Sequence, residues 1–137
     1  MREIKFRAWD SEYKTMVDNC GVLNGNAWDI RLMKSRMIPL ETTALEAIEN
    51  IVHERIILMQ YTGLKDKNGK EIYEGDILKN DHGVFDVLWN VSRACFSVRE
   101  MHKSVGTGLH VVDIFSEIIG NIYENPELLK ETQNGQK

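Results

Sequence analysis

Two histidines and an aspartate in the second half of the chain are the side chains best suited to chemistry. His102, His110 and Asp113 could relay protons or hold a metal ion, because histidine titrates near neutral pH and is a common metal ligand. The histidines stand eight residues apart across a glycine-containing segment, and no third ligand follows at a diagnostic spacing. The pattern therefore predicts surface or structural histidines in preference to a catalytic or metal site.

Cys20 and Cys95 are the two cysteines, and either thiol would need a neighbouring base to act as a nucleophile. Cys95 stands between apolar residues, which favours a buried and inert thiol. A small secreted domain usually carries more cysteines, and the opening residues do not resemble a secretion signal. We therefore expect reduced thiols and a soluble protein of the cytoplasm.

Two loops look superficially like ligand sites. Residues 66–69 (Asp-Lys-Asn-Gly) begin like a calcium loop, but Lys70 and Ile77 occupy the fifth and twelfth positions, where oxygen ligands are required. Residues 106–108 (Gly-Thr-Gly) lack the third glycine, the preceding strand and the following helix of a phosphate-binding loop. We therefore expect no cofactor and no metal, and we expect that the protein is not an enzyme.

One basic cluster is visible near Trp28. The chain as a whole is acidic, with a formal net charge of −4 and a pI of about 5.6, so a solvated basic face is favoured over a nucleic-acid site. The alternative stays open, because folding could add further basic side chains to one surface. The candidate nucleic-acid patch consists of Arg31, Lys34, Arg36, Arg93 and Lys103.

Aromatic side chains on predicted strands are candidates for an interface, because aromatics often join an apolar core to a polar rim. Core packing is the alternative for most of them. The candidate interface residues are Trp9, Tyr61, Tyr73 and Trp89. Trp9 falls on the strand face opposite Ile4 and Phe6, which favours its burial at a subunit or subdomain contact.

The elements that must position these side chains are mostly strands. Alternating polar and apolar residues predict a hairpin from residues 3–9 and 13–17, and an apolar run predicts a central strand at 55–61. Residues 42–54 form one apolar stripe, with a capping-box spacing at their start, and predict a helix. Further short strands are predicted at 70–73, 76–79, 83–89, 94–101, 110–114 and 118–123. Residues 18–40 show no clear periodicity.

The many short strands after residue 55 predict a small barrel or a strongly bent sheet. We therefore expect an α+β fold that is mainly β, with an irregular N-terminal α+β subdomain at residues 1–58. A barrel subdomain follows at 59–130, and the opening strand could also pack with it. Leu128 and Leu129 could form a final helical turn, and residues 131–137 are expected to be a frayed tail.

Turn residues between positions 60 and 78 are the clearest geometric signal. The Asn-Gly pair at 68–69 tolerates positive φ at both positions, as a tight hairpin turn requires. A Gly-Asp pair then opens the next extended run. The residues expected to shape the backbone here are Gly63, Asn68, Gly69, Gly75 and Asp76.

Three segments together resemble the YopX-like family of phage and prophage proteins. They are the opening MREIKFRAWD, the central MQYTGLKDKNGKEIYEGDI and the closing GNIYENPELL. The resemblance spans both ends and the middle of the chain. It implies an irregular α+β part followed by an SH3-like barrel, a tendency to form oligomers, and no catalytic residues that could be carried over.

The expected function combines the residues with this resemblance. We expect an accessory protein of phage or prophage origin, working in the cytoplasm of a bacterial host cell through protein–protein contacts as a homo-oligomer. A host or phage protein is a further possible partner. The alternative is a nucleic-acid-binding module that uses the small barrel. The sequence does not determine the biochemical activity.

Overall fold

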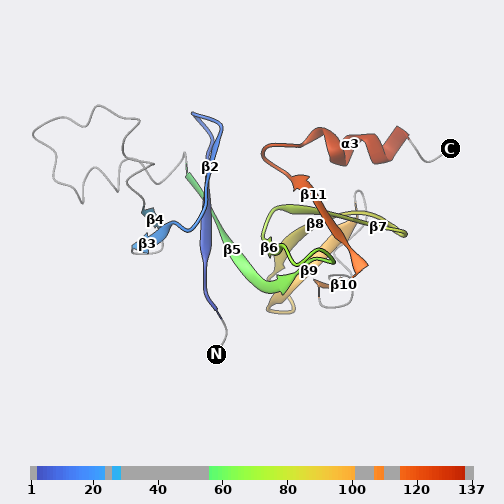
Figure 1. The fold of residues 1–137 in the computed structure, drawn as a ribbon, viewed down its shortest axis with the longest axis horizontal. Coiled ribbons are helices and arrows are strands. Elements are labelled where there is room, and N and C mark those ends of the chain that lie inside the picture. Colours follow the sequence, from blue (N-terminus) through green and yellow to red (C-terminus); the bar gives the residue numbers. More distant parts are fainter. Residues whose placement is uncertain (1–2, 24–25, 29–55, 101–106, 110–114, 135–137) are drawn as a thin grey trace, which may run out of the picture. The chain divides into compact units, whose positions relative to one another are not determined.

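The computed structural model describes residues 3–23, 26–28, 56–100, 107–109 and 115–134, and these parts are mainly β, with curled antiparallel sheets (Figure 1). The chain divides into an N-terminal unit, Ile4–Gln60, and a C-terminal unit that consists mainly of Tyr61–Lys137. This division falls two residues beyond the boundary predicted at residue 58. Strand β5, Ile56–Lys65, begins in the first unit and ends in the second.

The N-terminal unit begins with the predicted hairpin. Strand β1, Phe6–Asp10, pairs with β2, Thr15–Val17, in antiparallel register. Asp10 closes the turn, because its Oδ1 accepts the backbone N–H groups of Glu12 and Tyr13 at 3.0 and 3.1 Å. The other edge of β1 pairs with β5. The core of this unit consists of Ala8, Val17 and Cys20, with Phe6, Ile56 and Leu58 packed against them.

A second hairpin of this unit lies within the segment that showed no clear periodicity. Strand β3, Gly21–Leu23, pairs with β4, Asn26–Trp28, as a separate two-stranded sheet. Each strand has three residues, which is too short for an alternating pattern to stand out. The helix predicted at residues 42–54 lies outside the described residues, as does the strand predicted at 110–114.

The C-terminal unit contains most of the described strands. They are β6, Glu71–Tyr73; β7, Asp76–Asn80; β8, Gly83–Asn90; β9, Cys95–Glu100; β10, Thr107–Gly108; and β11, Glu117–Asn121. Strands β7 to β11 form one antiparallel sheet in the order β10-β9-β8-β7-β11, while β6 pairs with the end of β5. Figure 1 shows the strands of this unit curling over one another.

One side of the curled sheet forms the core of the C-terminal unit. Alternation along β8 and β9 brings Val87 opposite Val98, and the same side of β7 contributes Leu78. The buried core residues are Ile72, Leu78, Val87, Val98 and Leu109, with Leu64, Phe85, Phe96 and Ile118 packed against them. The sequence predicted most of these strands as short runs separated by turn residues, whereas the pairing shows which of their sides is buried.

Three elements differ from the prediction. Strand β5 continues past the predicted end at residue 61 to Lys65, which pairs with Glu71 of β6. The register of this pairing shifts between Tyr61 and Lys65, where Gly63 adopts a φ of 86°. Residues 107–108, for which no strand was predicted, form the edge strand β10 beside β9. Helix α3, Glu127–Asn134, is longer than the predicted turn, so residues 131–134 are helical and do not belong to a frayed tail.

Candidate interaction site

The β8–β9 hairpin carries a partly exposed aromatic pair at its closed end. Trp89 lies opposite Phe96, with ring centroids 5.0 Å apart and an interplanar angle of 75°, an edge-to-face contact. The Trp89 side chain is 44% exposed, and Val91, in the adjoining turn, is 84% exposed. We refer to Trp89, Val91 and Phe96 as the hairpin tip.

The turn of this hairpin is held by local hydrogen bonds. Asn90 Oδ1 accepts the backbone N–H groups of Ser92 and Arg93 at 3.1 and 3.3 Å. Ala94 completes the turn with a φ of 51°, in the left-handed region that a non-glycine residue adopts at a cost. The hairpin tip is therefore presented by a defined turn joined to two long strands.

The hairpin tip continues the row of buried apolar side chains on β8 and β9, which we call the core stripe. Trp89 and Phe96 lie on the same side of the two strands as Val87 and Val98, which are both 2% exposed. The apolar stripe therefore begins in the core and ends at the surface. An aromatic ring that is anchored on one edge and open on the other is the side-chain type most enriched where proteins bind one another.

The opposite side of the same hairpin carries a buried carboxylate. Arg99 donates to Asp86 through both Nη2–Oδ2 at 2.7 Å and Nε–Oδ1 at 3.2 Å. The Asp86 side chain is 4% exposed and that of Arg99 is 48% exposed. The hydrogen bonds to Asp86, and then its negative charge, raise the pKa of Arg99. Asp86 and Arg99 lie opposite each other on β8 and β9. Their ion pair therefore adds a side-chain contact between the two strands that carry the hairpin tip.

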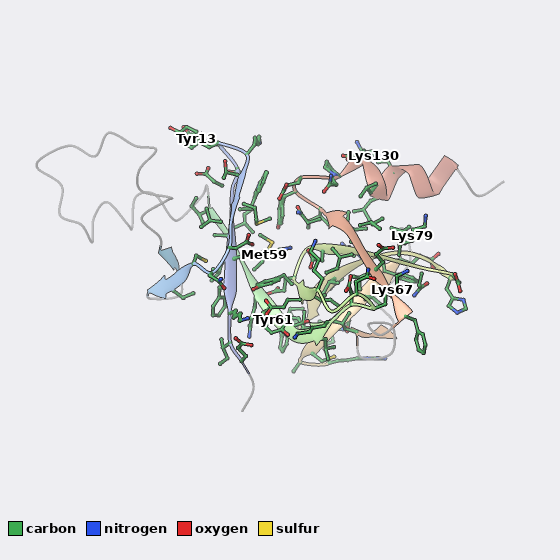
Figure 2. The ribbon with its side chains drawn as sticks, viewed as in Figure 1. Tyr13, Met59, Tyr61, Lys67, Lys79 and Lys130 are labelled. Atoms are coloured by element: carbon green, nitrogen blue, oxygen red, sulfur yellow. The ribbon has the colours of Figure 1, made fainter. Side chains whose placement is uncertain are left out.

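Three of the four aromatic residues predicted at an interface are buried within the chain. Trp9 and Tyr61 are each 5% exposed and Tyr73 is 7% exposed. Tyr61, labelled in Figure 2, forms a tilted ring pair with Tyr73, with centroids 5.5 Å apart. Among these four residues, Trp89 alone offers a large exposed ring.

The predicted basic patch is only partly within the described residues. Arg93 is exposed in the turn of the β8–β9 hairpin, close in sequence to Trp89. The other members of the patch, Arg31, Lys34, Arg36 and Lys103, lie outside the described residues. The patch therefore stays a prediction.

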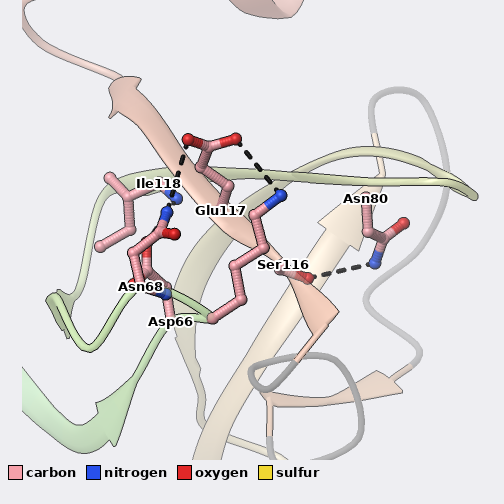
Figure 3. A network of polar contacts seen from close by, with 7 residues as sticks. Asp66, Asn68, Asn80, Ser116, Glu117 and Ile118 are labelled. Carbon is pink, nitrogen blue, oxygen red and sulfur yellow. Dashed lines mark hydrogen bonds and ion pairs between the residues drawn. The ribbon is translucent and has the colours of Figure 1, made fainter.

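A network around Asp66 joins the β5–β6 loop to β11 (Figure 3). Asp66 Oδ1 accepts the backbone N–H groups of Asn68 and Lys70, each at 2.9 Å, and Oδ2 accepts that of Ile118 at 3.0 Å. Lys67 adds a backbone hydrogen bond to Ser116 O at 2.9 Å. We call these contacts the Asp66 clasp, and we include in it the contacts that Glu117 makes with Asn68 and Lys67.

Side chains on the outside of the Asp66 clasp add weaker contacts. Glu117 accepts a hydrogen bond from Asn68 Nδ2 at 3.4 Å and pairs with Lys67 Nζ at 3.5 Å. Ser116 Oγ accepts a hydrogen bond from Asn80 Nδ2 at 3.1 Å. Since Lys67 and Glu117 are each about half exposed, their ion pair adds little by itself.

The electrostatics of the clasp favour the charged form of Asp66. Burial alone would raise the pKa of this carboxyl, but the N–H groups of Ile118, Lys70 and Asn68, together with the charge of Lys70, lower the pKa overall. The carboxylate is 6% exposed. Its oxygens are occupied by backbone donors, so the arrangement serves to hold the chain and is not set up for general acid–base chemistry.

The predicted turn residues lie at points where the backbone bends. Gly63, Gly69 and Gly75 adopt φ values of 86°, 81° and 82°, but Asn68 does not have a positive φ, so the two-residue turn predicted at 68–69 is wrong, and a longer loop between Lys65 and Glu71 takes its place. Gly75 also donates to Val87 O and accepts from Ile122 N, each at 2.8 Å, which joins this turn to β8 and to the end of β11. Asp76 Oδ2 accepts the N–H of Tyr73 at 2.8 Å across the same turn.

The candidate chemical groups give no assembled reaction centre in the part of the chain that the structure describes. No group of three or more histidine, cysteine or acidic side chains that could hold a metal occurs among the described residues. His102, His110 and Asp113 lie outside them. Cys20 is a buried thiol and Cys95 a half-buried one, whose Sγ lies 3.6 Å from Ser97 Oγ. Within the same residues, no helix is long and apolar enough to cross a membrane.

Curled antiparallel sheets and a YopX-like pattern at both ends and the middle define the class of protein. The family described as YopX protein matches residues 5–130, and the chain belongs to the YopX family. The solved structure of protein EF1440 from Enterococcus faecalis is similar, with a TM-score of 0.59 and 28% sequence identity, over 94% of this chain and 99% of that one. The comparison with curated proteins gives no match.

The sequence did not reveal the polar contacts that hold the hairpins. Asp66 drew attention only as the start of a failed calcium loop, and Asp86 is an acidic residue within an apolar strand. A charged residue inside an apolar strand could have indicated a buried ion pair, since such a side chain is rarely buried without a partner. The partner, Arg99, could be found only by aligning the two strands in their register.

Proposed function

We propose that this YopX-family protein is a phage- or prophage-derived accessory protein that acts in the cytoplasm of a bacterial host cell through protein–protein contacts, as a homo-oligomer and without enzymatic activity. The observation that carries the proposal is the hairpin tip. Trp89 continues the core stripe of the C-terminal unit onto the surface and is 44% exposed there. Family membership supports the phage origin.

The hairpin tip has the properties of an energetic anchor. Tryptophan contributes disproportionately to binding when its ring enters a partner's pocket, and a rigid ring loses little conformational entropy. The contact with Phe96 already restrains the Trp89 ring, and the exposed Val91 extends the apolar surface by one residue. A second copy of the chain is the occupant that we propose for this surface.

We propose further that the C-terminal unit is an SH3-like barrel. Two sets of contacts support closure of its sheets. The Asp66 clasp joins the β5–β6 loop to β11, which is an edge of the five-stranded sheet. Gly75 joins the β6–β7 turn to β8 and to Ile122. Closure of this kind removes exposed strand edges, which otherwise invite aggregation.

The test is the oligomeric state of variants of the hairpin tip. Val91→Lys changes a side chain that is 84% exposed and leaves the Trp89–Phe96 contact in place, while Trp89→Lys removes the anchor itself. Both variants should lower the molar mass measured by light scattering after size exclusion. Phe115→Lys is the matched control, because Phe115 is 70% exposed but lies outside the hairpin. An oligomer that survives both hairpin variants would contradict the proposed surface.

Nucleic-acid binding is the second candidate function. The observation that favours it is the presence of exposed Arg93 on the same hairpin as exposed Trp89, since single strands are bound by positive charge together with stacking. Binding that falls steeply with salt and is weakened by Arg93→Glu, but not by Lys130→Glu on α3, would support this candidate. No retention of nucleic acid at low salt would exclude it.

A further inference from the structure

The exposed loop between β5 and β6 contains an asparagine followed by glycine, a pair that is chemically labile. Residues 67–70 are all exposed, and Gly69 has a φ of 81° with no heavy atom within 4 Å of the position that a Cβ would occupy. We infer that Asn68 is a site of spontaneous deamidation whose rate is controlled by the Asp66 clasp, and that its conversion to a carboxylate releases this loop from β11.

The reaction needs only water. The backbone nitrogen of Gly69 attacks Cγ of Asn68, the new C–N bond forms as the Cγ–Nδ2 bond breaks, and ammonia leaves with the proton of the Gly69 nitrogen. The product is a five-membered succinimide ring. Water then opens the ring at either carbonyl, giving aspartate or isoaspartate. One water is consumed and one ammonia released, with no oxidation or reduction.

The site is open to this chemistry because the attacking residue has no side chain. A Cβ on the residue after asparagine would crowd the ring closure, and glycine removes that obstacle. Exposure of the whole loop gives water access to the succinimide. The loop is also a turn at the surface, where covalent change is better tolerated than in the core.

The Asp66 clasp restrains the same reaction. The N–H of Gly69 donates to the backbone carbonyl oxygen of Asp66 at 3.0 Å, a bond within the loop whose shape the clasp holds, so the attacking nitrogen is engaged in the folded chain. The neighbouring N–H of Asn68 donates to Asp66 Oδ1, and its Nδ2 donates to Glu117 Oε1. These contacts hold both the nucleophile and the leaving group, so the loop must open before the ring can close.

Deamidation would turn these attractions into repulsions. A carboxylate at position 68 cannot donate to Glu117, and the two negative charges would face each other across the contact that Asn68 Nδ2 now makes. Isoaspartate would also lengthen the backbone by one carbon between the two N–H groups that Asp66 Oδ1 binds. The loop would then lose its hold on β11.

The experiment follows Asn68 by peptide mapping in chains aged in neutral buffer. Asn24-Gly25 and Asn134-Gly135 carry the same dipeptide and serve as internal references in the urea-unfolded chain. We expect slow conversion at Asn68 in the folded wild type and about tenfold faster conversion when unfolded, the factor for breaking one or two net hydrogen bonds. Folded Asp66→Ala should approach the unfolded rate.

Glu117→Ala provides a second readout, because it removes the acceptor of the Asn68 Nδ2 hydrogen bond and leaves the Asp66 contacts in place. Since Glu117 is about half exposed, this variant should fold even where Asp66→Ala does not. Its rate should lie between those of the wild type and the unfolded chain. Equal deamidation rates at Asn68 in the folded and the unfolded wild type would overturn the claim that the Asp66 clasp controls this reaction. An Asn68 that stays unmodified in both folded variants, while the unfolded chain reacts, would overturn the site.

Discussion

Asp66 and Ile118 are 52 residues apart in sequence and are joined by a hydrogen bond of 3.0 Å from the Ile118 backbone N–H to Asp66 Oδ2. Ile118 lies on β11, an edge strand of the five-stranded sheet, and this N–H would otherwise need another partner. A loop carboxylate therefore takes the place that a neighbouring strand would have. The carboxylate makes this contact while its other oxygen shapes the loop itself.

Removal of the charge at Asp66 should change how stability depends on pH. The pKa of Asp66 is lowered in the folded chain, whereas an unfolded aspartate titrates near about 3.9. The stabilisation is therefore fully present above that unfolded value and is lost as the pH falls through the folded pKa. We expect Asp66→Asn to be less stable than the wild type at neutral pH.

The measurement is urea unfolding across the acid range. The difference in unfolding free energy between the wild type and Asp66→Asn should shrink as the pH falls below about 4. Lys67→Ala is the control, because it removes only an exposed partner of Glu117 and should keep the acid dependence of the wild type. A difference that stays constant with pH would show that the Asp66 charge does not stabilise the fold.

Replacement of Gly75 should damage the C-terminal unit. Its φ of 82° is unfavourable for a β-branched side chain, and its backbone contacts Val87 and Ile122. We expect Gly75→Val to lower the unfolding free energy by about 2 kcal/mol or more. Thermal melting followed by circular dichroism provides the test, with exposed Lys79→Val as the control. An unchanged melting temperature for Gly75→Val would refute the role of this turn.

Ala94 should be a site where glycine stabilises the protein. Ala94 is exposed and has a φ of 51°, so its side chain contributes strain and little packing. Because glycine adopts this conformation freely, Ala94→Gly should raise the unfolding free energy by about 1 kcal/mol. Ala94→Val should lower it. Chemical denaturation of the pair decides the point, since a glycine variant that is less stable than the wild type would rule out strain in this turn.

The Asp86–Arg99 pair should respond asymmetrically to truncation. Arg99→Ala leaves a buried carboxylate without the guanidinium that binds it, whereas Asp86→Ala leaves a half-exposed arginine that water can solvate. We expect a loss of about 3 kcal/mol for Arg99→Ala and a smaller loss for Asp86→Ala. Urea denaturation of both single variants and the double variant measures this. Equal losses of unfolding free energy in the two single variants would mean that the burial of Asp86 does not determine how strongly each truncation destabilises the protein.

Local pattern predicted the strands better than it predicted what joins them. Strands β8 and β9 were predicted as short runs rich in apolar residues between turn signals, but their buried side, which carries Val87 and Val98, was not predicted, because both sides of β9 carry apolar and polar residues. The edge strand β10 was missed, because two residues carry no period and their pairing depends on the neighbouring strand. Helix α3 was underestimated, because its polar residues gave no apolar stripe beyond Leu129.

The candidate site could be predicted only in part. The sequence proposed Trp89 together with Trp9, Tyr61 and Tyr73, and exposure separates the first from the other three. Alternation places an aromatic on one side of a strand but does not show where that side leaves the core. The Asp66–Ile118 contact was beyond reach, since no short-range pattern links residues separated by 52 positions.

The molar mass of the wild-type chain in solution tests the central proposal most directly. Size exclusion with light scattering should give a mass at least twice 15.8 kDa, the mass of one chain, and Val91→Lys should shift it toward that of one chain. A wild-type mass of 15.8 kDa at every concentration up to the solubility limit would contradict the account of the hairpin tip as a contact between copies.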